Sequence, residues 1–326
     1  MQTSVLGSSS LRVTRIGLGL AAIGRPAYLG PGREADLGPD RSVESLRRRA
    51  HELLDAAYQT GVGYIDTARS YGLAERFLGS WLIDRARPPG DPMVGSKWGY
   101  RYVGEWRIDA PVHEVKDHSL AALRRQYAES RAELGEHLSL YQIHSATLDT
   151  GVLGDPGVLS ELTRLKEQGL AIGLSVSGPS QPEVIRHALE IRVDGEHLFQ
   201  TVQATWNVLE RSAGPALSEA HQAGLRVIVK EALANGRLTN RGDLAAGALG
   251  TIAAAHGVGV DAVAIAAVMA NEWVDVVLSG AVTTGQLASN LAALSVSLPA
   301  SETEALALLS ESSQRYWSLR KSSPWT

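Results

Sequence analysis

Hydrophobic and polar residues follow two alternating patterns along almost the whole chain. In one pattern, apolar residues recur every three or four positions, which is typical of a helix that buries one face. The segment 43–57 has this spacing, with Ser42 before it as an N-cap and Gly61 after it as a stop signal. The same spacing predicts further helices at 73–85, 116–134, 156–168, 181–189, 214–223, 261–270 and 284–294.

The other pattern is a short run of mostly apolar residues, which is typical of a buried strand. Strands and helices alternate, and eight such pairs predict an α/β fold, a (β/α)8 TIM barrel. An N-terminal β-hairpin is predicted at 5–16, with its turn at 7–10. The predicted barrel strands are 16–23, 63–67, 93–96, 139–144, 171–176, 201–205, 226–229 and 274–278.

A doubly wound open sheet shows the same alternation and is the competing layout. It would normally carry a G-x-G-x-x-G turn between its first strand and first helix. The segment 17–22 comes near to this motif, but it opens a long loop instead of a helix. We therefore expect one barrel domain over residues 1–326, with long strand-end loops at 24–40 and 99–115. Long loops in a barrel tend to carry function.

Composition excludes several classes of function. The chain has 326 residues, of which 44% are hydrophobic and 20% charged, as in an ordinary globular protein. The absence of cysteine excludes a disulfide framework, a cysteine nucleophile and a thiolate metal site. The net charge of -4 gives no reason to expect nucleic acid or an anionic membrane as a partner. Without a signal pattern or a long apolar run, the sequence favours a cytoplasmic location.

Polar side chains with complementary chemistry follow three successive predicted strands. Asp66 ends the second strand and Tyr71 lies in the turn after it, while Lys97 ends the third strand and His144 the fourth. Each of these residues alone is more often structural than catalytic. Because active residues of a barrel lie at the carboxyl ends of its strands, we expect the four to meet at one face.

These four side chains form a logical set for proton transfer to a carbonyl group. A tyrosine is a weak acid at neutral pH, and a nearby lysine cation is expected to lower the pKa of Tyr71. Asp66 would keep Lys97 charged and fixed, and His144 would orient the carbonyl oxygen. A metal-dependent hydrolase would need more clustered His, Asp and Glu ligands than these, so we expect no metal site.

The segment 61–72, Gly-Val-Gly-Tyr-Ile-Asp-Thr-Ala-Arg-Ser-Tyr-Gly, resembles the signature of the aldo-keto reductase family around its catalytic Asp and Tyr. Lys97 and His144 fall where that family has its Lys and His. The resemblance implies a TIM barrel, a nicotinamide cofactor that lies across the strand ends, and reduction of a carbonyl or oxidation of an alcohol. It makes Tyr71 the proton donor or acceptor.

The nicotinamide end of the implied cofactor site matches the family only in part. Ser175 and Gln203 stand where the family binds the carboxamide, but Val176 replaces the usual Asn or Arg. Lys230 stands where an aromatic ring normally stacks on the nicotinamide, and Trp206 is an alternative aromatic surface. The segment after the seventh strand also aligns Leu233 and Gly236 with cofactor-binding positions.

The segment 278–290 resembles the family's site for the adenosine phosphate. Gln286 and Asn290 match one large branch, and Arg241 aligns with a basic residue that can reach a phosphate. Positions that often carry Lys or Arg in NADPH-preferring members are uncharged here, at Gly280, Val282 and Gln286. A 2′-phosphate needs charge-assisted donors, so NADP(H), the family default, is only slightly favoured over NAD(H).

The substrate is expected to be a small carbonyl or alcohol compound. The walls of its pocket are predicted from the long loops, the strand ends and the C-terminal tail. Two other functions stay open: a sugar (aldose) dehydrogenase that works in the oxidative direction, and a cofactor-binding regulatory or scaffold protein with weak turnover. The predicted wall residues are Ala22, Ile23, Tyr28, Trp98, Tyr100, Trp106, Trp206, Trp317 and Trp325.

Overall fold

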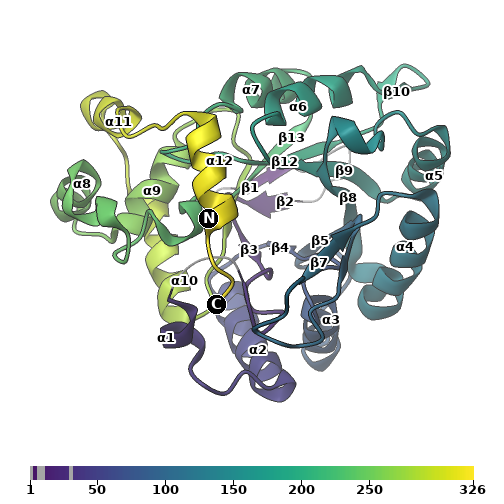
Figure 1. Ribbon diagram of the computed structural model, residues 1–326, viewed down its shortest axis with the longest axis horizontal. Helices are drawn as coiled ribbons and strands as arrows, with labels where there is room; N and C mark the ends of the chain where they lie inside the picture. Colours follow the sequence, from purple (N-terminus) through teal and green to yellow (C-terminus); the bar gives the residue numbers. More distant parts are fainter. Residues whose placement is uncertain (1–2, 6–11, 29–31) are drawn as a thin grey trace.

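The barrel is the centre of the molecule. The structure, a computed structural model, describes residues 3–5, 12–28 and 32–326. Within these residues, eight parallel strands close into a barrel in which chain neighbours are also neighbours in space (Figure 1). The closed barrel confirms the predicted fold class. Its strands are β3 (Ile16–Gly19), β4 (Tyr64–Asp66), β5 (Met93–Trp98), β8 (Leu138–Ala146), β9 (Ala171–Val176), β12 (Thr201–Thr205), β13 (Arg226–Lys230) and β14 (Val276–Ser279).

Helices surround the barrel, and every predicted helix is present with ends that shift by a few residues (Figure 1). The helices are α2 (Val43–Gln59), α3 (Ala74–Asp84), α4 (Leu120–Leu134), α5 (Pro156–Glu167), α6 (Gln181–Glu190), α7 (Gly214–Gln222), α9 (Val260–Met269) and α10 (Thr284–Leu291). Four of them, α2, α4, α5 and α10, begin at a side-chain N-cap. The Ser42 side chain accepts a hydrogen bond from the Ser45 amide, and the Thr283 side chain accepts one from the Gln286 amide.

Tyr64 fills the inside of the barrel and links its packing to the strand ends. A Cβ atom at Gly17 would lie 2.8 Å from the Tyr64 ring, and one at Gly95 would come closer still to its hydroxyl. The small residues of β3 and β5 therefore leave room for this ring. The Tyr64 hydroxyl donates a hydrogen bond of 3.1 Å to Asp66 Oδ2, so the barrel core reaches the predicted site.

The loops predicted as irregular contain secondary structure of their own. The first long loop includes a short helix, α1 (Arg33–Leu37). The second forms a β-hairpin from β6 (Tyr100–Tyr102) and β7 (Glu114–Lys116). The predicted N-terminal hairpin is formed by β1 (Thr3–Val5) and β2 (Arg12–Thr14), while its predicted turn at 7–10 lies outside the described residues. A further hairpin joins β10 (Arg192–Val193) to β11 (Glu196–His197).

Three helices that were not predicted lie in the last third of the chain: α8 (Ala248–His256), α11 (Ala300–Ala307) and α12 (Ser313–Ser322). Figure 1 shows α12 in yellow, lying across the barrel face. Among the described residues, no single helix is both long and apolar enough to cross a bilayer. By length and composition alone, only the bent pair of α8 and α9 would pass that test together.

Candidate active site

A buried ion pair joins the carboxyl ends of two neighbouring barrel strands. Asp66 ends β4 and is 2% exposed, and Lys97 lies on β5 and is fully buried. The Lys97 ammonium donates hydrogen bonds to Asp66 Oδ1 and, at 2.9 Å, to the Thr67 carbonyl. Asp66 Oδ2 accepts a further hydrogen bond of 2.8 Å from Gln203 Nε2. Burial lowers the pKa of Lys97, and the Asp66 carboxylate opposes that shift.

Tyr71 lies directly above this pair. The Lys97 ammonium is 4.9 Å from the centre of the Tyr71 ring. Burial, reinforced by the negative charge of Asp66, raises the pKa of Tyr71 well above its ordinary value. The net shift is therefore opposite to the lowering expected from Lys97, because burial of the phenolate and the negative charge of Asp66 raise this pKa. Tyr71 is protonated at neutral pH.

His144 completes the group from β8. Its ring lies edge-on to the Tyr71 ring, with 5.4 Å between the ring centres. Its Nδ1 atom is 3.3 Å from the Ser70 hydroxyl oxygen. Burial lowers the pKa of His144 well below its ordinary value, and the cations Lys97 and Lys230 lower it further, so the imidazole is neutral at pH 7. The structure thus brings together the four side chains that the sequence singled out.

A cavity of about 930 Å³ opens above these residues. Asp66, Tyr71 and His144 line one part of it, while Lys97 lies behind them. Nine of the ten predicted cofactor residues also line it, and they come from β12, from the end of β13 and the segment after it, from the segment after β14, and from α10. They are Gln203, Lys230, Leu233, Gly236, Arg241, Gly280, Val282, Gln286 and Asn290.

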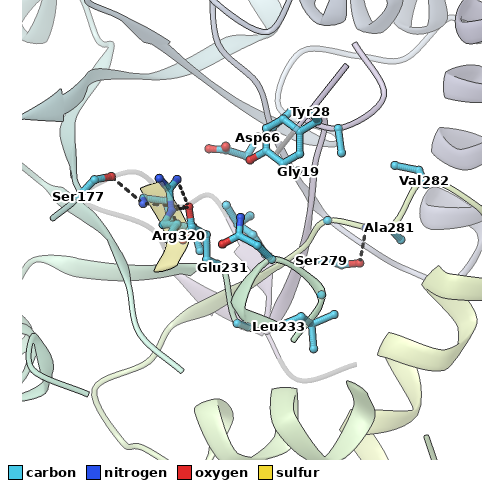
Figure 2. A pocket seen from close by; sticks show the side chains of 18 of the residues that line it. Gly19, Tyr28, Asp66, Ser177, Glu231, Leu233, Ser279, Ala281, Val282 and Arg320 are labelled. Carbon is cyan, nitrogen blue, oxygen red and sulfur yellow. Dashed lines mark hydrogen bonds and ion pairs between the residues drawn. The ribbon is translucent and has the colours of Figure 1, made fainter. Parts of the chain in front are cut away.

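The tenth residue, Ser175, does not belong to that lining. It is fully buried, and its hydroxyl oxygen accepts a hydrogen bond of 2.9 Å from the Ser145 amide. Ser177, two residues further along, lines the cavity instead (Figure 2). Ser175 is still inside strand β9, whereas Ser177 lies just beyond its end, where a side chain can face the cavity.

Lys230 is held by hydroxyl groups. Its ammonium donates hydrogen bonds of 2.9 Å to the Ser177 hydroxyl and 2.7 Å to the Thr205 hydroxyl. Its nearest carboxylate oxygen, on Glu231, is 3.9 Å away. Burial lowers the pKa of Lys230 to about 8, against the opposing pull of Glu231. Lys230, which stands where an aromatic ring was expected, is therefore an amine whose pKa lies close to neutral pH.

A second buried ion pair lies on this side of the cavity, and the sequence pattern did not reveal it. Arg320, on α12, donates a hydrogen bond of 2.9 Å from Nε to Glu231 Oε1, as Figure 2 shows. Burial alone would raise the pKa of Glu231, but Arg320 and Lys230 outweigh it and hold that pKa at about 2. Glu231 also has a φ of 56°, in the left-handed region that ordinary side chains disfavour.

The predicted substrate residues divide into two groups. Tyr28 lines the cavity, as do Ala22, Tyr100, Trp317 and Trp325. Ile23, Trp98 and Trp206 are buried and are not among its lining residues. Trp98 packs edge-on against His118, and Trp206 packs against Trp273, so both stabilise the barrel wall. Trp106 donates from its indole nitrogen to the Arg41 carbonyl, at 2.9 Å.

The C-terminal tail forms part of the cavity wall through Trp325. Thr326 and Tyr28 exchange two backbone hydrogen bonds, of 3.0 and 3.2 Å. The Trp325 ring stacks on His113, with 4.3 Å between ring centres. Arg25 lies 4.8 Å from the centre of the Trp325 ring and pairs with Glu114 at 2.8 Å. Tail, first loop and β6–β7 hairpin thus meet beside Tyr71.

A metal centre has no candidate ligands here. Within the part of the chain that the structure describes, no group of three or more His, Cys, Asp or Glu side chains is arranged to hold a metal ion. The reactive groups of the cavity are instead a phenol, an imidazole and buried amines.

Known proteins are similar to this chain in sequence and in fold. Residues 15–311 match the family model described as Aldo/keto reductase family. Aldo-keto reductase ausK of Emericella nidulans is 27% identical over 92% of this chain and 79% of its own length. Pyridoxal 4-dehydrogenase of Microbacterium luteolum is 26% identical over 57% of each chain. The solved holo form of an aldo-keto reductase from Bacillus halodurans has a TM-score of 0.70 at 22% identity, over 96% of this chain and 97% of that one. The chain belongs to the aldo/keto reductase family.

Proposed function

We propose that this chain is an NAD(P)H-dependent reductase of small carbonyl compounds, with Tyr71 as its proton donor. One observation carries the proposal: Asp66, Tyr71 and His144 line one cavity, and the Lys97 ammonium lies directly beneath the Tyr71 ring. Family membership makes oxidoreductase chemistry the natural use of such a group. The roles of the single residues follow from their charge states.

Tyr71 and His144 are both neutral at pH 7 and act on the same carbonyl oxygen. A bound nicotinamide supplies the hydride to the carbonyl carbon. The Tyr71 hydroxyl gives its proton to the oxygen, so the carbonyl becomes an alcohol and Tyr71 becomes a phenolate. Lys97 stabilises that negative charge from 4.9 Å below the ring, and a proton from solvent restores the phenol. His144 orients the oxygen by a hydrogen bond.

The lining of the cavity fits a nicotinamide dinucleotide. The cavity reaches from Tyr71 and His144 to the first turn of α10, where Gly285 and Gln286 line it. The amino end of a helix favours a phosphate group. A Cβ atom at Gly280 would meet no atom within 4 Å, so the strand end beside that turn is open. Gln203, Leu233 and Asn290 would contact the cofactor along its length.

Discrimination between NADPH and NADH is expected to be small. The lining residues Gly280, Val282 and Gln286 are uncharged. Arg241 lines the cavity as well, but its guanidinium pairs with Asp36 at 2.6 Å. A 2′-phosphate would have to compete for that guanidinium. We therefore infer that NADP(H) is favoured over NAD(H) by less than about tenfold in affinity, or ~1.4 kcal/mol.

Two groups support reduction as the favoured direction. The raised pKa keeps Tyr71 in the phenol form that carries the proton for reduction, whereas alcohol oxidation needs its phenolate. Lys230 replaces the family's stacking ring, and its cation would disfavour the positively charged oxidised nicotinamide. The sugar dehydrogenase hypothesis, which needs the oxidative direction, has less support from these groups.

A substrate panel tests the proposal. Aldehydes, ketones and the matching alcohols would be followed at the nicotinamide absorbance band with each cofactor, after fluorescence titrations of NADPH and NADH. We expect both reduced cofactors to bind and aldehydes or ketones to be reduced faster than the alcohols are oxidised. If neither cofactor binds below about millimolar concentration, the proposed function is wrong.

A further inference from the structure

We propose that the substrate of this enzyme carries an oxyanion, such as a carboxylate or a phosphate, and that Lys116 binds it. This inference rests on the proposed function, since it places the oxyanion relative to Tyr71 and His144. It adds a property that the four catalytic side chains do not determine, namely the class of carbonyl compound that the cavity accepts.

Lys116 is a cavity-lining cation held only by neutral groups. It lies on strand β7, and its ammonium donates hydrogen bonds of 3.1 Å to the Ser145 carbonyl and 3.3 Å to the Thr147 hydroxyl. It also lies 5.4 Å from the centre of the Tyr100 ring. Among the described residues, no carboxylate forms an ion pair with it; burial lowers its pKa, and the charge of Asp149 opposes that shift from beyond ion-pair distance. A partly buried ammonium without an anionic partner is costly unless a ligand supplies one.

The arginines that line the same cavity differ from Lys116 in this respect. Arg25 pairs with Glu114 at 2.8 Å, Arg241 with Asp36 at 2.6 Å, and Arg320 with Glu231. Lys230 bonds two hydroxyl groups inside the wall. Each arginine charge is thus already compensated by the protein, which leaves Lys116 as the lysine beside His144 that can pair with a ligand.

Lys116 lies on the catalytic side of the cavity. Ser145, which accepts one of its hydrogen bonds, directly follows His144, and its φ of 49° fixes that carbonyl in an unusual direction. The Tyr100 ring is close to both groups: its centre is 5.4 Å from the Lys116 ammonium and 5.0 Å from the centre of the His144 ring. An oxyanion on Lys116 would therefore lie on the same side of the cavity as a carbonyl held at His144 and Tyr71.

Three cations act on His144: Lys97, Lys230 and Arg25 each disfavour a positive charge on the imidazole. Asp66 and Glu114 act in the opposite sense on the neighbouring Tyr71 ring. The positive charge beside His144 stabilises negative charge on the carbonyl oxygen during hydride transfer, and Lys116 supplies the positive charge for the oxyanion. Aromatic side chains at Tyr28, Tyr100 and Trp325 supply apolar walls for the remainder of the molecule.

Three related aldehydes test the inference: 4-formylbenzoate, its neutral methyl ester, and 4-formylphenyl phosphate. For the wild-type enzyme we expect kcat/KM to be about tenfold or more higher for either anion than for the ester, mainly through KM. Lys116→Met should bring the two anion-to-ester ratios close to one, and Lys116→Arg should keep part of the preference. Because every ratio is measured on one protein sample, partial misfolding cancels.

Lys321→Met is the matched control. Lys321 also lines the cavity, but it is exposed on α12, so its loss should leave the ratios unchanged. Binding of terephthalate, an unreactive dianion, to the cofactor-loaded enzyme gives a readout besides turnover, and it should weaken in Lys116→Met alone. Equal reduction of ester and anions by the wild type, or an unchanged ratio in Lys116→Met, would overturn the inference and leave the proposed function standing. Failure of all three aldehydes with both cofactors would instead count against the proposed function.

Discussion

The cavity is bounded by two buried ion pairs of similar chemistry and different construction. Asp66 and Lys97 come from adjacent strands of the barrel, so the register of β4 against β5 sets their positions. Glu231 follows β13, whereas its partner Arg320 comes from α12, 89 residues further along the chain. The first pair belongs to the rigid barrel, and the second ties a separate helix to it.

The difference shows how one cavity can combine fixed chemistry with an adjustable boundary. Around Asp66 and Lys97, the side chains of Tyr64 and Gln203 satisfy the remaining carboxylate oxygen, so the pair cannot rearrange without disturbing the barrel core. The Arg320 side chain is 28% exposed, and its ion pair with Glu231 ties the end of α12 to the barrel. We expect the first pair to determine turnover and the second to determine stability and access.

Lys97→Met should give the largest effect. It leaves the Asp66 carboxylate buried without its counter-ion, which costs about 3–5 kcal/mol of unfolding free energy. It also removes the charge that stabilises the Tyr71 phenolate, so kcat should fall by about 10²–10⁴. Steady-state kinetics and urea unfolding measure the two effects, with Lys321→Met as a control. A wild-type kcat in Lys97→Met would refute the role of this lysine in stabilising the phenolate.

Arg320→Met should mainly reduce stability. It leaves Glu231 with only Lys230, 3.9 Å away, as a cationic partner. We expect a loss of about 2–3 kcal/mol, less than for Lys97 because Arg320 is partly exposed. In a double-mutant cycle, adding Glu231→Gln should recover part of the loss. Arg315→Met on the same helix is the control, since Arg315 is 71% exposed and lies 3.8 Å from its partner. Equal losses of unfolding free energy for Arg315→Met and Arg320→Met would mean that the Arg320–Glu231 pair adds no more stability than an exposed ion pair.

The pH dependence of the unfolding free energy should show a smaller effect, which comes from Lys230 on the β13 side of the cavity. The pKa of Lys230 is about 8 in the folded chain, below its ordinary value near 10.4. Between these values the unfolded chain binds more protons than the folded one, so the free energy of unfolding should rise with pH by an amount on the order of 1–3 kcal/mol. Urea unfolding at pH 7 to 10.5 measures it. Subtracting the curve of Lys230→Met isolates this lysine from Lys97, and identical curves for both proteins would contradict the assignment.

Local periodicity was sufficient to predict the barrel and the face on which Asp66, Tyr71, Lys97 and His144 meet. The eight strands and surrounding helices follow from the alternation of two apolar patterns, and residues at successive strand ends must meet once the barrel closes. Ser175 was predicted from the family resemblance and not from the strand pattern. The predicted strand 171–176 has the bounds of β9, and Ser177 is the first serine beyond its end. Trp98 follows Lys97 on one strand, so alternation of side chains already places the two on opposite faces.

The remaining features depend on long-range packing that no local pattern contains. The β6–β7 hairpin lies within a segment of mixed polarity, and nothing in its spacing indicates that Lys116 reaches the residue after His144. The same holds for Arg320 and Glu231, which become partners only because α12 crosses the barrel face. The raised pKa of Tyr71 also required the structure, since burial is a property of the folded chain.

The most direct test of the central claim is the Tyr71→Phe variant, measured for both turnover and cofactor binding. The change removes one hydroxyl group and keeps the ring that contacts His144 and Lys97. We predict that carbonyl reduction falls by a factor of about 10² or more, while the dissociation constants for NADPH and NADH stay nearly the same. Retention of full activity by Tyr71→Phe would contradict the account, because the proton would then come from another group.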